Sequence, residues 1–263
     1  MKKLIFFLIF TLSFAKYENL ITNLIGEQKY KEYHGLIQTL IQEQNASNIS
    51  DVVTLLKENG LIELFFDKPV LIHPKFVFTN NNPIFNTKTL YHSLNNLGYY
   101  YFYPYKISKN TKYSITLELQ STHHIDPVNL INEIKNYGCE IKNIKYLDNN
   151  YEYTIDCQKE YIPAPVITDK LKAYLNVRGE YWFDTNNTKT VIISASKYDK
   201  WHPYIVFYDK NLNIINLIAE KNIQKNIQKN IKIDIPNECK YIKIRDNYTK
   251  ENIKRGIFIK GIK

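Results

Sequence analysis

The sequence predicts an α+β protein in three consecutive parts: a short helical segment over residues 16–60, a ferredoxin-like module over 61–160, and an antiparallel β-sandwich over 161–263. Three observations predict this order. Apolar residues recur at helical spacing near the beginning of the chain. One set of helix signals occurs twice in the middle. Short runs of β-branched and aromatic residues, separated by polar turns, fill the last part.

The beginning of the chain has the composition of a cleavable export signal. Lys2 and Lys3 precede an apolar run, Leu4–Phe14, and Ala15 is a small residue at the expected cleavage point. The alternative is an uncleaved membrane anchor, but a spanning helix needs roughly 17–25 apolar residues, more than this run contains. We therefore expect cleavage after Ala15, residence in a bacterial periplasm, and no transmembrane span in the mature chain.

Residues 16–60 are expected to form three short amphipathic helices. The first ends near Gly26, the second presents Leu36 and Leu40 on one face, and the third ends at Gly60. Short helices are marginal when isolated and need tertiary partners. These helices therefore either pack on the module that follows or present a groove to another protein.

The helix signals of the middle part occur twice, forty residues apart. Asn86 is placed to cap a first helix, and Gly98 to end it in a left-handed conformation. Asp126 and Gly138 are the corresponding cap and stop of a second helix. Each helix carries one apolar face, formed by Leu90, Tyr91, Leu94 and Leu97 in the first and by Leu130, Ile131, Ile134 and Tyr137 in the second.

Each of these helices lies between two predicted strands. Phe76–Phe78 and Tyr99–Lys106 flank the first helix, while Ile115–Leu119 and a strand beginning at Cys139 flank the second. Two such units related by a pseudo-twofold axis give the β-α-β-β-α-β order of a ferredoxin-like fold. One extra strand, Tyr151–Cys157, is expected to turn back after this set.

Cys139 and Cys157 are expected to form a disulfide. They stand at the two ends of a predicted hairpin, where opposed residues of antiparallel strands have Cα atoms about 4.5–5.5 Å apart, within disulfide range. An oxidising compartment permits the bond, which should stabilise the fold by about 3 kcal/mol. Cys239 is left over; we expect a buried thiol, the alternative being a link to a partner.

The last part is expected to begin after a proline-containing linker, residues 161–165, and to consist of short antiparallel strands. The expected strands are Ala173–Val177, Tyr181–Phe183, Thr190–Ala195, Tyr204–Tyr208, Ile214–Ile218, Ile231–Ile235, Tyr241–Arg245 and Ile257–Ile259. A tandem Lys-Asn-Ile repeat over residues 221–232 is expected to be a loop between strands, with a narrow helical stripe as the alternative.

The net charge of +9 is distributed along the chain. Its simplest interpretation is an ordinary solvated surface. Other envelope proteins are expected partners, and an anionic envelope polymer, a glycan or lipid head groups are alternatives. Export excludes cellular nucleic acid as a partner.

The candidate contact residues for a glycan or a partner lie in the last part and are Trp182, Tyr198, Trp201, His202 and Tyr204. Exposed aromatic rings beside polar groups suit sugar rings, because the apolar face of a sugar stacks on an aromatic ring. The competing interpretation is that these residues belong to the core and turns of the sandwich.

Two other segments allow a functional interpretation. The aromatic run Tyr99–Tyr105 could stack nucleic-acid bases, but export removes that option, and we expect a strand covered on both sides. His123 and His124 with Asp126 could bind a metal ion. Because Asp126 is already needed as a helix cap, we expect a solvent-exposed pair of loop histidines and no metal or cofactor.

The sequence contains no nucleophile elbow, phosphate-binding glycine loop or metalloprotease helix. We expect a non-catalytic envelope protein that acts as an interaction or scaffold component. The alternative is a protein that binds cell-wall glycan through the sandwich. A scaffold needs an exposed apolar patch, whereas the glycan binder needs Trp182, Trp201 and Tyr204 to converge on an exposed surface.

Overall fold

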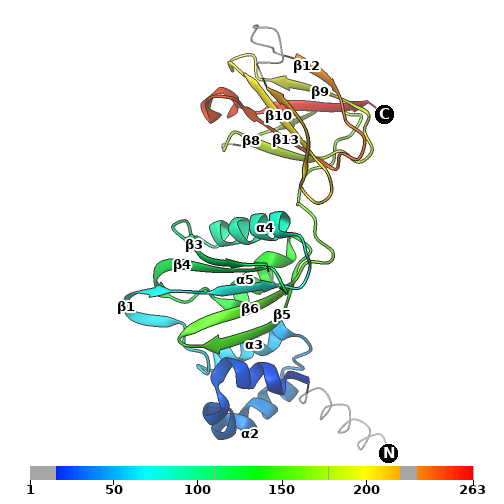
Figure 1. Ribbon diagram of the computed structural model, residues 1–263. Coiled ribbons are helices and arrows are strands. Elements are labelled where there is room, and N and C mark those ends of the chain that lie inside the picture. The colour runs from blue at the N-terminus through cyan, green and yellow to red at the C-terminus, as the bar shows by residue number, and fades with distance from the viewer. Residues whose placement is uncertain (1–15, 110, 177, 220–229, 263) are drawn as a thin grey trace, which may run out of the picture. The chain divides into compact units, whose positions relative to one another are not determined.

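The computed structural model describes residues 16–109, 111–176, 178–219 and 230–262 and is a mixed α+β protein with mostly antiparallel sheets (Figure 1). The predicted leader, residues 1–15, and most of the tandem repeat, residues 220–229, lie outside the described residues. The chain divides into two compact units between Tyr161 and Ile162. We call them unit 1 and unit 2 and describe each by itself.

Unit 1 begins with three helices: residues 16–25, α2 (Glu27–Glu43) and α3 (Ile49–Glu58). Asn48 caps α3, since its side-chain oxygen accepts the backbone N–H of Asp51 at 3.1 Å. The apolar face of α3 is buried, and α3 contacts both α5 and β5 of the following sheet module. The helices therefore pack on that module, which removes their apolar faces from water.

The sheet of unit 1 contains six described strands. They are β1 (Phe65–Ile72), β2 (Lys75–Phe78), β3 (Tyr103–Ser108), β4 (Ser114–His123), β5 (Glu140–Leu147) and β6 (Asn150–Asp156). β3 pairs antiparallel with one side of β4. β1 and β2 pair antiparallel with successive stretches of its other side. The long strand β4 therefore lies between β3 on one side and both β1 and β2 on the other.

In a standard β-α-β-β-α-β sheet, β5 would pair directly with β2. Here β6 takes that place beside β2. It lies beside β2 in parallel, and β5 pairs antiparallel with its outer side. Asp148 and Asn149, both with positive φ, form the two-residue turn that joins β5 to β6. The ring of Tyr153 in β6 stacks on that of Phe76 in β2, with centroids 5.4 Å apart. The extra strand is thus inserted into the sheet and not added at its edge.

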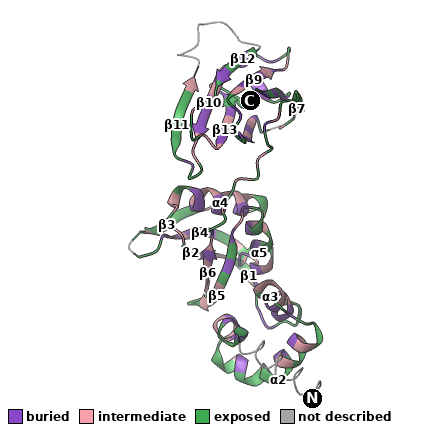
Figure 2. Ribbon diagram, turned by 90° about the vertical axis from the view of Figure 1, so that its right-hand side faces the viewer, coloured by how far each residue is buried: buried purple, intermediate pink, exposed green. Residues whose placement is uncertain are grey.

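Two helices, α4 (Pro83–Asn96) and α5 (Pro127–Lys135), contact each other and cover one face of this sheet (Figure 2). Alternate strand residues, including Phe76, Ile115 and Ile155, are buried under them. Residues of the opposite face, such as Lys75 and Glu118, are only half-buried. No described element of unit 1 covers that opposite face, which we call the open face.

The prediction that Asn86 caps the first of these helices is wrong, because α4 begins one turn earlier. Asn82 is the cap, its side-chain oxygen accepting the N–H of Phe85 at 3.2 Å. Pro83 takes the first helical position, where its missing N–H costs nothing. Asn86 lies inside the helix and is fully buried. The Asn82-Pro83 pair therefore corresponds to the Asp126-Pro127 pair at the start of α5.

The predicted disulfide is present. Cys139 and Cys157 are bonded, with their Cα atoms 4.2 Å apart. They directly flank the paired residues Glu140 and Asp156 at the open end of the β5–β6 hairpin. Both cysteines are buried. Cys239, in unit 2, is a free thiol that is half-buried and not fully buried as expected.

Unit 2 contains two antiparallel sheets of four described strands each. The strands are β7 (Lys172–Tyr174), β8 (Glu180–Asp184), β9 (Thr190–Ala195), β10 (Pro203–Tyr208), β11 (Ile214–Ala219), β12 (Asn230–Asp234), β13 (Tyr241–Asp246) and β14 (Ile257–Ile262). In the first sheet their order is β11-β10-β13-β8, and in the second it is β12-β9-β14-β7. Buried residues of both sheets, with Trp201, form one hydrophobic core. Alternating burial along β8, β9, β12 and β14 gives one face of these strands to the core and the other to the outside.

Candidate functional site

Trp201 is not at the surface, although the sequence made it a candidate contact. Its side chain is 0% exposed and belongs to the core of unit 2. Its indole N–H donates to the backbone oxygen of Arg245 at 3.1 Å, which satisfies the one polar group of a buried tryptophan. In this structure the ring cannot reach a ligand on the surface.

His202 and Tyr198 lie on loops and do not join the other candidates. The backbone N–H of His202 donates to Asp246 at 2.7 Å, and its ring packs edge-on against Tyr248. Tyr198 is 70% exposed in the turn after β9, where the ammonium of Lys197 lies 4.9 Å from its ring centroid. β9 belongs to the other sheet of unit 2 from β8 and β10, the strands that carry Trp182 and Tyr204.

Trp182 and Tyr204 do lie on the same surface. In β8, Tyr181 and Phe183 point into the core, so Trp182 between them points outward. In β10, Ile205 and Phe207 point inward, so Tyr204 and Tyr208 point outward. We call this outward side of the β11-β10-β13-β8 sheet the outer face of unit 2.

The side chains of the outer face form a connected layer. Trp182 stacks on Tyr208 with ring centroids 5.1 Å apart, and its indole N–H donates to Glu180 at 2.7 Å. Glu180 also pairs with Lys243 at 2.9 Å. The guanidinium of Arg245 lies 4.0 Å from the ring centroid of Tyr204, a close cation–π contact. Burial in this layer raises the pKa of Tyr208.

Two residues of β13, Lys243 and Arg245, complete this layer and were not among the candidates predicted from the sequence. Register places Arg245 between Tyr204 and Glu180, and Lys243 between Val206 and Trp182. The available signal was the alternation in residues 241–245, where charged residues at 243 and 245 interrupt apolar ones. That alternation marks Lys243 and Arg245 as outward, but only the strand order places them between β8 and β10.

The expectation that the aromatic run of unit 1 is covered on both sides is wrong. β3 pairs only with β4 among the described strands, so its other edge is open. The large side chains before and within it are exposed: Tyr100, Tyr101, Tyr103, Tyr105 and Ile107. Tyr101 has the highest exposure of these, at 93%. We call this group the β3 edge.

The open face of the unit 1 sheet carries charged and aromatic groups next to the β3 edge. His73 and Glu118 lie 2.7 Å apart, and the hydroxyl of Tyr103 donates to the same carboxylate. The ring of Tyr105 packs against that of His73 with centroids 4.7 Å apart. These contacts hold the two tyrosines of β3 in fixed orientations beside the edge.

His124 is buried, so the predicted pair of exposed loop histidines is wrong for this residue. It is 2% exposed, and the rings of Phe66, Tyr146 and Tyr151 surround it. Its Nε2 atom has no hydrogen-bond partner among the described residues. Burial, with a smaller contribution from the neighbouring His123, lowers the pKa of His124 to about 4.

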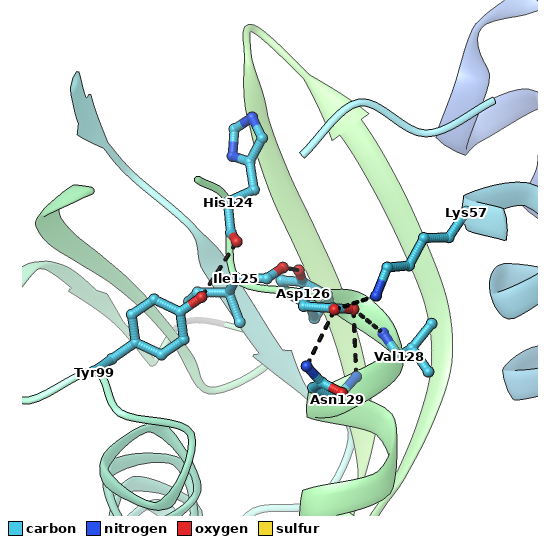
Figure 3. A network of polar contacts seen from close by, with 8 residues as sticks. Lys57, Tyr99, His124, Ile125, Asp126, Val128 and Asn129 are labelled. Atoms are coloured by element: carbon cyan, nitrogen blue, oxygen red, sulfur yellow. Dashed lines mark hydrogen bonds and ion pairs between the residues drawn. The ribbon is translucent and has the colours of Figure 1, made fainter. Parts of the chain in front are cut away.

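Asp126, the third member of that sequence motif, caps α5 and forms an ion pair (Figure 3). Its carboxylate accepts the N–H of Val128 at 2.9 Å and pairs with the ammonium of Lys57 at 2.5 Å. The hydroxyl of Tyr99 donates to the backbone oxygen of His124 at 3.2 Å. Among the described residues there is no cluster of three metal-ligating side chains.

No protein-family model matches the sequence, and no curated protein matches it either. Within the described ranges, no helix is both long enough and apolar enough to span a membrane. The surfaces of the two units are therefore the observations from which a function can be inferred.

Proposed function

We propose that this chain is an exported, non-catalytic envelope protein that binds another envelope protein as part of an assembly. The observation that carries the proposal is the β3 edge, where a strand with one unpaired side and the segment before it together expose five large side chains. A strand paired on one side only leaves backbone N–H and C=O groups that another strand can bind. Aromatic side chains are enriched at protein interfaces, where they contribute much of the binding energy.

The partner segment is an extended acidic strand. Lys106, Lys109 and Lys112 lie in β3 and in the hairpin that leads to β4, and all three are exposed. In the part of the chain that the structure describes, none of them has a carboxylate within ion-pair distance. Pro104 removes one donor from the edge. Lysine and proline at an edge limit indiscriminate pairing, so a partner needs acidic residues and a matching register.

Export and the periplasmic location are part of the same proposal. The leader signature of residues 1–15 supports it. The disulfide supports it as well, because such bonds persist in oxidising compartments. Proteins in that compartment fold without contact with cellular nucleic acid, so the exposed tyrosines of β3 are assigned to a protein partner.

We also propose that unit 1 is a ferredoxin-like module with an inserted strand and that unit 2 is a β-sandwich. Two strand–helix–strand segments in succession, with both helices on one face, support the first assignment. Two four-stranded antiparallel sheets that share one hydrophobic core support the second. Both architectures occur with many functions, so neither assigns one.

Site-specific photo-crosslinking in intact cells tests the proposal. A photoreactive phenylalanine analogue replaces Tyr101 on the β3 edge. The control carries it at Leu147, an exposed apolar residue at the β5–β6 turn, on the far side of the sheet from β3. We expect one defined envelope protein to be crosslinked from position 101 through an acidic extended segment, and none from position 147.

A charge variant tests whether the lysines near the β3 edge contribute to the same binding. Replacing Lys106, Lys109 and Lys112 together by glutamine should lower the crosslinking yield from position 101 at least about tenfold, which corresponds to about 1.4 kcal/mol. Equal yields from positions 101 and 147 would contradict the docking surface. Recovery of the protein from the cytosol with Met1 still present would contradict the compartment.

A further inference from the structure

The outer face of unit 2 carries an uncompensated cation. Arg245 is exposed, and in the described residues no carboxylate lies within ion-pair distance of it. The other cation of β13, Lys243, pairs with Glu180 at 2.9 Å, and Lys240, just before the strand, pairs with Asp184 at 2.7 Å. The charge available to a ligand on this face is therefore concentrated on the Arg245 guanidinium.

That guanidinium lies against an aromatic ring. Its Cζ atom is 4.0 Å from the ring centroid of Tyr204, and a guanidinium packed on an aromatic ring can still present its planar fork of N–H donors to a carboxylate. Because the side chain is already ordered, less conformational entropy is lost when it binds an anion. Arg245 thus has the geometry of an anion-binding group and not of a mobile surface charge.

An aromatic layer lies beside this cation. Trp182 is stacked on Tyr208, and the bond from its indole N–H to Glu180 fixes its ring. Val206, between the two outward tyrosines of β10, is buried beneath the layer, and Leu217 in the adjacent strand β11 is exposed. The ammonium of Lys243 also lies 5.4 Å from the ring centroid of Trp182. The face therefore combines the Arg245 guanidinium with an ordered layer of half-buried aromatic rings.

We propose that the outer face of unit 2 binds a carboxylate-bearing sugar chain. The apolar faces of the pyranose rings pack on Trp182 and Tyr204, and a sugar carboxylate accepts a charge-assisted hydrogen bond pair from Arg245. Neutral sugars bind more weakly because they leave Arg245 unpaired. This site is in unit 2 and its residues are distinct from the β3 edge, so it goes beyond the protein-binding function proposed above.

The test uses the full oxidised chain and measures binding by isothermal titration calorimetry. The probe is a uronic acid oligosaccharide prepared from alginate, and the comparison is a neutral maltooligosaccharide of the same length. We expect the uronate to bind at least about tenfold more tightly than the neutral oligosaccharide. Arg245→Gln should remove this difference, and Trp182→Ala should weaken binding of both probes.

The matched control is Tyr198→Ala. Tyr198 is an exposed tyrosine of the same unit with a lysine over its ring, but it lies outside the outer face. Its loss should leave uronate binding unchanged. Trp182→Phe retains an aromatic ring and should keep most of the affinity, so it separates ring stacking from a folding defect. Unchanged thermal unfolding of unit 2, followed by the fluorescence of buried Trp201, confirms that each variant is folded.

Three results would overturn the proposal: no binding of the uronate by the wild-type chain, equal affinity for uronate and neutral probes, or a loss of binding in Tyr198→Ala as large as in Arg245→Gln. The variants of Lys106, Lys109 and Lys112 should bind the uronate normally. Failure of the sugar site and failure of the β3 edge are therefore distinguishable.

Discussion

His124 is the residue with the most unusual environment in unit 1. Its neutral imidazole lies among three aromatic rings, and its Nε2 atom is buried. A protonated imidazole there would be a buried charge without a paired carboxylate, because Asp126 is engaged by Lys57. The fold therefore holds this histidine neutral.

This environment makes unit 1 sensitive to acid. The pKa of His124 is about 4 in the folded chain and 6.5 in an unfolded one. As the pH falls from 6.5 to 4, the unfolded chain takes up a proton that the folded chain does not. The free energy of unfolding should therefore fall by about 3 kcal/mol across this window and lose nothing more from this group below it. Urea unfolding followed by far-ultraviolet circular dichroism measures the slope, and tryptophan fluorescence, which reports unit 2 alone, identifies the transition that belongs to unit 2.

Two variants isolate the effect. His124→Phe fills the same aromatic site without a titrating group and should lose this part of the pH dependence. His123→Phe, at the adjacent and only half-buried position, should keep it. An identical pH dependence in wild type and His124→Phe would show that the acid sensitivity has another origin.

At this scale the sequence identified residue types but not always their environments. Trp182 faces outward and is half-buried, because it alternates with the buried residues Tyr181 and Phe183 in a strand. Trp201 precedes β10 in a loop, where no periodicity fixes the direction of a side chain. His124 lies at the end of β4, just after the alternation stops. Burial at such positions depends on the surrounding elements, here Phe66, Tyr146 and Tyr151.

Among the elements, the two glycines that end α4 and α5 have different surroundings despite their equivalent places in the repeat. Gly98 and Gly138 both have positive φ, at 93° and 70°. A Cβ on Gly98 would have no atom within 4 Å, whereas one on Gly138 would lie 2.1 Å from the backbone oxygen of Lys159. Only Gly138 combines the left-handed conformation with a close approach of the backbone.

Alanine at these two positions should therefore have unequal effects. Gly98→Ala should cost about 1 kcal/mol, the strain of a left-handed alanine. Gly138→Ala should cost about 3 kcal/mol, because the Lys159 backbone must also move. Urea unfolding of unit 1 measures both. Equal losses of unfolding free energy would mean that the backbone at Lys159 moves away from the new methyl group without an energetic cost.

The helices and strands themselves were more predictable from the sequence than the order of the strands within the sheets. The local signals of caps, alternation and turns gave strands close to β4, β6 and β9. The start of α4 was misplaced because both Asn82 and Asn86 are acceptable caps, and the fixed spacing of the repeat favoured the wrong one. The insertion of β6 beside β2 depends on pairing between distant residues, such as Phe76 with Tyr153, which no local pattern encodes.

At the scale of the whole molecule, the two units can be observed separately. Both tryptophans, Trp182 and Trp201, are in unit 2, and the disulfide is in unit 1. Tryptophan fluorescence therefore reports unit 2 alone, while the bond between Cys139 and Cys157 acts only on unit 1.

Removing the disulfide should destabilise one unit and not the other. The double variant Cys139→Ala and Cys157→Ala should lower the free energy of unfolding of unit 1 by about 3 kcal/mol, since the bond closes a loop with a sequence separation of 18. The unfolding midpoint of unit 2, followed by tryptophan fluorescence, should stay the same. Cys239→Ser is the control and should leave unit 1 unaffected.

The thiol chemistry gives an independent check on this prediction. Cys239 should be the single thiol of the oxidised chain, and burial raises its pKa to about 11. It should react slowly with alkylating reagents in the folded protein and fully in denaturant. Alkylation of three cysteines in the denatured, unreduced protein from its native source would contradict the disulfide.

The burial of both bonded sulfurs has a consequence for biogenesis. Once the hairpin is packed under α5, neither an oxidant nor a thiol–disulfide oxidoreductase can reach these atoms, because Cys139 and Cys157 are 1% and 0% exposed. Oxidation must therefore take place on a chain that has not yet finished packing. Chains that pack before oxidation would need to open again before the bond between Cys139 and Cys157 could form.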